Sequence, residues 1–132
     1  EHSVTFNGYV NMPAQMVGLQ ADASDDGQLS EADAWFAMGP DEGVLPAFAV
    51  NLFNEHGTVA PTSVVLSGQS LSVTYTFEIP GRSAVSLLHF QSATQTNAAA
   101  EEAAEALDAL PEGAMQGLAE AESNLGNMAP TP

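Results

Sequence analysis

The chain lacks cysteine and lysine altogether, and Arg82 is the one arginine among its 132 residues. Without cysteine there can be no disulfide bond, no thiolate metal site and no thiol nucleophile. No apolar run approaches the roughly 20 residues of a membrane-spanning helix. Seventeen acidic residues against one arginine give a formal net charge of -16. The protein should therefore repel nucleic acid and anionic membranes and attract cations.

The length and composition predict a single domain across residues 1–132, because 45% hydrophobic residues suffice for one buried core. Acid-rich surfaces suit surroundings that are rich in divalent ions or salt. The sequence opens with EHSVTF rather than with Met, which favours a mature form whose leader was removed, although excision from a longer polypeptide would give the same start. We therefore expect a secreted or cell-surface protein, either a whole mature chain or a fragment.

The clearest strand signal lies in residues 71–79, where apolar side chains alternate with Ser, Thr and Glu. The apolar members are Leu71, Val73, Tyr75, Phe77 and Ile79. This alternation predicts a strand with one buried face and one face in water. Pro80 and Gly81 then favour a tight turn, and residues 84–90 are predicted to return as the second strand of a hairpin.

Three further segments are short, rich in β-branched and aromatic residues, and bounded by Gly, Pro, Asn or Ser: SVTFNGYV, AFAVNLF and TSVVLS. No segment of helical period separates them at the spacing that a parallel crossover requires. The prediction is a mainly β fold, an antiparallel β-sandwich of Ig-like or jelly-roll-like type, over residues 1–92. Residues 30–39 are ambiguous between a short helix and a strand that carries Trp35 inward.

The character changes after Phe90, because residues 93–128 are rich in alanine and other good helix formers. A first helix should bury Ala103, Leu107 and Leu110 and should end before Pro111. A weaker helical stretch should follow, with three apolar residues buried: Met115, Leu118 and Leu125. Residues 129–132 are predicted to form a loose tail.

The acidic loop, residues 22–33, reads DASDDGQLSEAD. Counted from Asp22, oxygen-bearing side chains fall at positions 1, 3, 5, 9 and 12 of a calcium-binding loop, Gly27 is sixth and Leu29 eighth. Calcium prefers several hard oxygen ligands, and the sixth position takes a turn that glycine adopts easily. The predicted calcium ligands are Asp22, Ser24, Asp26, the Gln28 carbonyl, Ser30 and Asp33, with Leu29 as an anchor to the core.

This register resembles that of EF-hand loops and of the calcium loops of dockerin modules, which also close with Asp. A second resemblance covers residues 33–50, 73–90 and 106–128, which are similar to β-sandwich segments of large secreted bacterial proteins. In those segments a sandwich is followed by an Ala-rich helix and a short Leu-containing cap. The second resemblance implies secretion and the fold but no catalytic residue. It leaves open that residues 22–33 form only an acidic structural turn.

No catalytic constellation, nucleophile elbow or phosphate-binding loop is visible in the sequence. The leading hypothesis is a non-enzymatic extracellular calcium-binding structural or adhesion module, which could be a self-assembling filament or surface-layer subunit. Its partners would be copies of itself, another extracellular protein or a polysaccharide. The alternative is a carbohydrate-binding module with an exposed platform of Tyr9, Trp35 and Tyr75; a hydrolase fragment would instead need convergent carboxylates in a cleft. Arg82 is expected to pair with Glu78 or another carboxylate.

Overall fold

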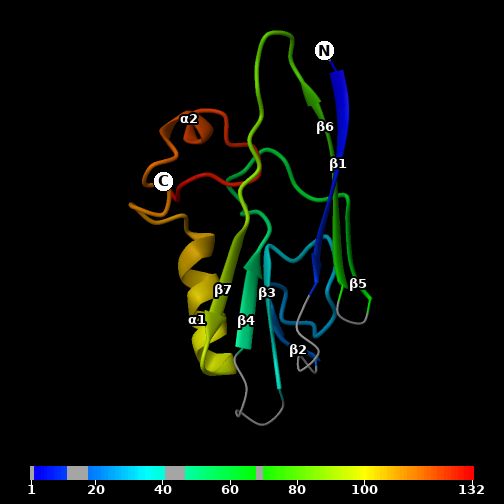
Figure 1. Cartoon of the computed structure of the whole chain (residues 1–132), viewed down its shortest axis with the longest axis vertical. Helices are drawn as coiled ribbons and strands as arrows, with labels where there is room; N and C mark the ends of the chain where they lie inside the picture. Colours follow the sequence, from blue (N-terminus) through cyan, green and yellow to red (C-terminus); the bar gives the residue numbers. More distant parts are fainter. Residues whose placement is uncertain (1, 12–17, 41–46, 68–69) are drawn as a thin grey trace.

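The computed structural model covers the whole chain, and it describes residues 2–11 as backbone together with residues 18–40, 47–67 and 70–132 (Figure 1). Its strands form two sheets. The first sheet contains β1 (His2–Asn11), β5 (Ser63–Ser67) and β6 (Ser70–Ile79) in the order β1-β6-β5. The second contains β2 (Gly18–Asp22), β3 (Trp35–Gly39), β4 (Ala47–Asn51) and β7 (Phe90–Thr94) in the order β2-β3-β4-β7. Every neighbouring pair is antiparallel, so the predicted antiparallel, mainly β sandwich is confirmed.

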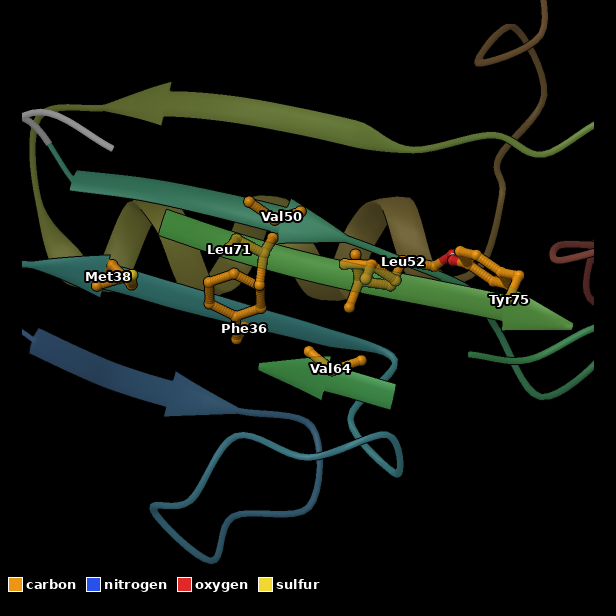
Figure 2. Packing of buried hydrophobic residues seen from close by; sticks show 8 residues of the cluster. Phe36, Met38, Val50, Leu52, Val64, Leu71 and Tyr75 are labelled. Atoms are coloured by element: carbon orange, nitrogen blue, oxygen red, sulfur yellow. The ribbon is translucent and has the colours of Figure 1, made fainter. Parts of the chain in front are cut away.

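The main core lies between the two sheets (Figure 2). The second sheet supplies Phe36, Met38 and Val50, together with Leu52 just after β4, and the first supplies Val64, Leu71, Val73 and Tyr75. The alternation predicted for residues 71–79 is confirmed, because Leu71, Val73 and Tyr75 are buried while the residues between them are less so. Burial of these apolar side chains stabilises the packing of the two sheets against each other.

The helix α1 (Asn97–Asp108) covers the other face of the second sheet (Figure 1). In β3, Trp35 and Ala37 face this helix while the alternate residues face the first sheet. Every residue of β3 is therefore buried, which explains why its sequence is an unbroken apolar run rather than an alternating one. The ambiguity over residues 30–39 is resolved in favour of a strand with Trp35 turned inward.

The N-terminus of α1 is capped by Thr96, whose Oγ1 accepts a hydrogen bond from the Ala99 N–H at 3.1 Å. The helix packs through Ala100 and Ala104 onto alanines of β3 and β4. The predicted burial of Leu110 is confirmed, but the predicted stripe is wrong for Ala103 and Leu107, because small residues on both partners let the helix approach the sheet closely on its alanine face. Ala103 and Leu107 remain only partly buried.

The predicted hairpin around Pro80 and Gly81 is wrong. Strand β6 pairs with β1 along its whole length and with β5 through Ser70–Thr74, and no strand after the turn pairs with it among the described residues. Residues 84–89 instead run beside the C-terminal part of the chain, where Ser86 forms an isolated parallel bridge with Leu125. The next strand, β7, joins the other sheet by pairing with β4.

The C-terminal part of the chain forms a third apolar cluster around Leu110, Met115 and Met128. It contains the short helix α2 (Ala119–Glu122). Burial of Met115 is confirmed, whereas Leu118 is 46% exposed, so its predicted burial is wrong. Neither of the two helices in the described chain is long and apolar enough to cross a membrane.

Two buried asparagines attach this part of the chain to the sandwich. Asn51 donates from Nδ2 to the Ala104 carbonyl at 2.8 Å. Asn54 donates to the carbonyls of Asp108 at 2.8 Å and Ala129 at 2.7 Å, and its Oδ1 accepts from the Ala129 N–H at 3.0 Å. Residue 129, predicted to start a loose tail, thus has both of its backbone groups hydrogen-bonded.

Candidate metal centre

The acidic loop connects β2 to β3, and the sheet holds its two ends together. Asp22 is the last residue of β2 and is paired with Phe36 of β3. Immediately beyond it, the Ala23 N–H donates to the Trp35 carbonyl at 3.0 Å. Because the loop starts and ends at paired strands, residues that are separated by about ten positions in sequence are brought back to one place.

Asp22 organises the first half of the loop. Its Oδ1 accepts hydrogen bonds from the Ser24 hydroxyl at 2.9 Å and the Asp26 N–H at 3.1 Å. Its Oδ2 accepts from the Gly27 N–H at 2.9 Å. The side chain is only 5% exposed, so nearly all of its solvation comes from these loop donors.

Burial alone would raise the pKa of Asp22, because a buried carboxylate loses hydration. The hydrogen bonds from Ser24 and from the backbone N–H groups of Asp26, Gly27 and Asp25 outweigh this effect, and together they hold the pKa of Asp22 below its ordinary value. The loop therefore keeps this carboxylate ionised, which is the form that binds a cation.

Asp33 closes the second half of the loop and is completely buried. Its Oδ1 accepts from the Ser24 N–H at 3.0 Å, and its Oδ2 accepts from the Ser30 N–H at 2.8 Å. Both carboxylate oxygens of Asp33 thus satisfy backbone donors of the loop, one near each end. This second task, as an acceptor for the backbone, was not evident from the sequence spacing.

Asp26 completes the acidic cluster, which we define as Asp22, Asp26 and Asp33. One carboxylate oxygen from each of the three residues lies within 4.8 Å of one from each of the others. Asp26 is exposed, and its Oδ1 also accepts from the Gln28 N–H at 2.8 Å. Three carboxylates at this separation could hold a metal ion, because a cation would offset the repulsion among them.

Two residues of the loop adopt the left-handed backbone conformation, Asp25 with φ 57° and Gly27 with φ 73°. Glycine adopts this conformation without strain, and aspartate is one of the few other residues that tolerate it. Leu29 is partly buried against the main core, so its predicted role as an anchor is confirmed. The loop is thus fixed at its ends by the sheet and near its middle by the core.

The remaining predicted ligands are not members of the acidic cluster. Ser24 lies beside the cluster through its hydroxyl, which donates to Asp22. The hydroxyl of Ser30 accepts from the Ala32 N–H at 3.2 Å, while the backbone N–H of Ser30 donates to Asp33. The structure therefore brings together the three aspartates of the predicted set, and the other three residues each hydrogen-bond to one of them: Ser24, Gln28 and Ser30.

Other residues that the sequence singled out do not form a second site. Trp35 is 7% exposed and Tyr75 is completely buried, so neither offers a surface for stacking a sugar, while the side chain of Tyr9 lies outside the described part. His89 is packed against Tyr75, with Nε2 2.9 Å from the hydroxyl. Within residues 18–40, 47–67 and 70–132, Arg82 makes no ion pair, and its expected pairing with Glu78 is absent.

Comparison of this chain with protein-family models, with curated proteins and with solved structures gives no match. Neither a fold family nor a relative therefore adds ligands or an activity to the acidic cluster, and the chemistry of the loop has to be inferred from its own residues.

Proposed function

We propose that the protein is a non-enzymatic extracellular structural or adhesion module whose acidic loop binds one calcium ion. The observation that carries this proposal is the acidic cluster, in which three carboxylates lie within 4.8 Å of one another. Two of the three, Asp22 and Asp33, are buried. They sit in a loop whose sequence register is that of calcium-binding loops.

The donor chemistry favours calcium over softer metals. The loop offers oxygen atoms alone, and it contains no histidine or cysteine, which are the residues that select zinc or copper. Calcium accepts about six to eight oxygens in flexible geometry, and water or backbone carbonyls can complete a partial set. A carboxylate oxygen that accepts one hydrogen bond retains a lone pair for a cation. This holds for Oδ2 of Asp22 and for both oxygens of Asp33, whereas Oδ1 of Asp22 already accepts two hydrogen bonds.

Calcium would act on the whole sandwich through the ends of the loop. The acidic loop joins the ends of β2 and β3, and Leu29 packs against the core between the sheets. Binding to the folded chain alone stabilises it by mass action. An extracellular module is surrounded by calcium and high salt, both of which also screen a net charge of -16. We infer that calcium stiffens the module and permits assembly into a filament or surface layer.

Titration calorimetry together with thermal unfolding tests calcium binding. Calcium should release or absorb heat on binding to the wild-type protein and should raise its Tm relative to chelator. Asp26→Asn should abolish both effects, because it removes an exposed carboxylate of the cluster while its amide oxygen can still accept from the Gln28 N–H. A wild-type protein with no heat of binding and the same Tm in calcium and in chelator would refute the proposal.

Asp25→Asn is the matched control for this experiment. It removes the same charge from the neighbouring residue of the same loop, and asparagine tolerates the left-handed backbone that Asp25 adopts. Asp25 is not part of the acidic cluster, so calcium binding should persist with at most a small loss from the reduced local charge. Light scattering across the same calcium series tests assembly separately.

A further inference from the structure

The outer strand of the first sheet has an edge that carries no charge. Strand β5 pairs with β6 on one side, and among the described residues no strand pairs with its other side. Its sequence, SVVLS, has no charged residue and no proline. Natural proteins usually protect such an edge with a charge, a proline or a bulge, because its free N–H and C=O groups otherwise accept another strand.

The same edge exposes apolar surface. Val65 is 51% exposed, and it is one of two large hydrophobic residues in the described chain that are exposed, the other being Leu118. Beside it lies a groove of about 370 Å³ that is lined by Leu19 of β2, by Val64, Val65 and Leu66 of β5, and by Gly27 and Leu29 of the acidic loop. The groove therefore runs between the margins of the two sheets and ends at the acidic loop.

The negative charge beside the groove favours a positively charged partner. The acidic loop contains five acidic residues and no basic one, which gives it a formal charge of -5. Three of these acids, Asp25, Asp26 and Glu31, are exposed. With one calcium ion bound the loop would still carry -3, from -5 plus 2. A second copy of this chain would bring the same acidic loop to the interface, so like charges would oppose it.

We propose that the β5 edge and its groove bind an extended, basic segment of another protein by strand addition. The partner strand would hydrogen-bond along β5, place alternate apolar side chains in the groove, and direct lysine or arginine toward the acidic loop. This inference adds a partner to the proposed structural role. It rests on that proposal, because it assumes that the role is association with another protein. It holds with or without calcium, because the loop is negative in both states.

The test uses a blocked seven-residue peptide of alternating valine and threonine with a lysine at each end. Nuclear magnetic resonance should show binding that weakens as salt is added, and slower amide exchange confined to Ser63–Ser67 and the groove. The same peptide with glutamate in place of both lysines should not bind. Absence of binding by the lysine peptide, equal binding of both peptides, or protection elsewhere on the surface would each overturn the proposal.

A pair of variants locates the site. Val65→Lys should weaken the lysine peptide at least about fivefold, because it removes half-exposed apolar surface and places a cation against the peptide's lysines. Leu118→Lys is the control: it introduces the same charge at the other exposed hydrophobic residue, and it should leave peptide binding unchanged. Equal weakening by both variants would show that net charge alone drives the binding, which would contradict an edge-specific site.

The experiment also separates this inference from the proposed function. Val65 is not in the acidic cluster, so Val65→Lys should still bind calcium, with at most a small loss from the cation placed beside the acidic loop. If calcium binds and the peptide does not, the strand-addition site is wrong and the calcium module stands. If the peptide binds and calcium does not, the calcium site is wrong and the strand-addition site stands. A wild-type dimer that Val65→Lys dissociates would show that a second copy occupies this edge instead.

Discussion

The side chain of Asn127 pairs with the backbone of Leu88 as a neighbouring strand would. Its Oδ1 accepts from the Leu88 N–H at 2.8 Å, and its Nδ2 donates to the Leu88 carbonyl at 2.6 Å. The same Nδ2 donates to the Leu52 carbonyl at 2.6 Å. One fully buried amide thus joins the C-terminal segment to two separate parts of the sandwich, and it uses each of its polar atoms to do so.

Asn127→Asp should destabilise the protein by about 2 to 4 kcal/mol, because the carboxylate lacks the donors that satisfy the two buried carbonyls. Chemical denaturation at neutral pH measures the loss. The control is Asn124→Ala, since the side chain of Asn124 is exposed and hydrogen-bonds only to the nearby Glu120 and Ser123; it should change stability by less than about 0.5 kcal/mol. Equal losses in the two variants would mean that the buried amide has no special role.

Gly57 should be intolerant of any side chain. A Cβ at this position would lie 2.5 Å from the Asn127 carbonyl oxygen and 2.8 Å from the Met128 nitrogen. Both atoms belong to the backbone, so the C-terminal segment would have to move. Gly57→Ala should therefore cost at least about 2 kcal/mol in the free energy of unfolding.

The matched control for Gly57 is Gly81→Ala. A Cβ at Gly81 meets nothing within 4 Å, so this change should be neutral or should stabilise the chain by a few tenths of a kcal/mol, roughly as expected when unfolded-state entropy falls. Thermal unfolding of both variants distinguishes the outcomes. If Gly57→Ala melts with the wild-type protein, the close approach of residues 57 and 127 is not maintained in solution.

Asp108 should weaken the fold at neutral pH. Burial raises its pKa above the ordinary value of 3.8, the charge of Glu55 raises it further, and His56 partly offsets these effects. Its Oδ1 is buried and accepts no hydrogen bond. Because the folded chain holds this proton more tightly than the unfolded chain, the free energy of unfolding should fall as pH rises from 3.8 through the raised pKa.

Asp108→Asn should consequently be more stable than the wild-type protein at pH 7, and the difference should shrink toward low pH, where Asp108 is protonated in both states. Glu105→Gln removes the same charge from an exposed residue of α1 and controls for the general relief of repulsion. Stability measured from pH 3 to pH 8 is the readout. A gain for Asp108→Asn that is independent of pH, or that equals the gain for Glu105→Gln, would contradict this account.

The parts of the fold that could be predicted are those set by neighbouring residues in the chain. The alternation of residues 71–79 identified β6, and the Ala-rich composition identified α1, because both signals arise within one element. The partner of β6 could not be predicted in this way. The turn at Pro80 and Gly81 favoured a hairpin with the residues that follow, but β6 instead pairs with β5, which directly precedes it, and with β1, which lies far earlier in the sequence.

The residues of the candidate site could be predicted from the sequence, but their structural role could not. Spacing along the acidic loop selected Asp22, Asp26 and Asp33, which the structure brings together. Spacing could not show that Asp22 and Asp33 are also the hydrogen-bond acceptors that hold the loop in shape. The buried Asn127 likewise has no local sequence signal, since its partners Leu88 and Leu52 lie 39 and 75 residues away.

The double use of Asp33 gives the last prediction, which separates the structural task of the acidic cluster from metal binding. Asp33→Asn retains one acceptor oxygen, but its amide group faces either the Ser24 or the Ser30 N–H, a donor against a donor. In chelator this variant should lose about 1 to 3 kcal/mol of stability, whereas Asp26→Asn should lose almost none because its side chain is exposed. In calcium both variants should lack the rise in Tm that the wild-type protein gains. A result in which Asp33→Asn matches the wild-type protein in chelator would show that the hydrogen bonds from Ser24 and Ser30 to the buried carboxylate do not stabilise the loop. If Asp33→Asn is unstable in chelator but calcium raises its Tm as much as that of the wild-type protein, Asp33 is a purely structural acceptor and the metal is held without it.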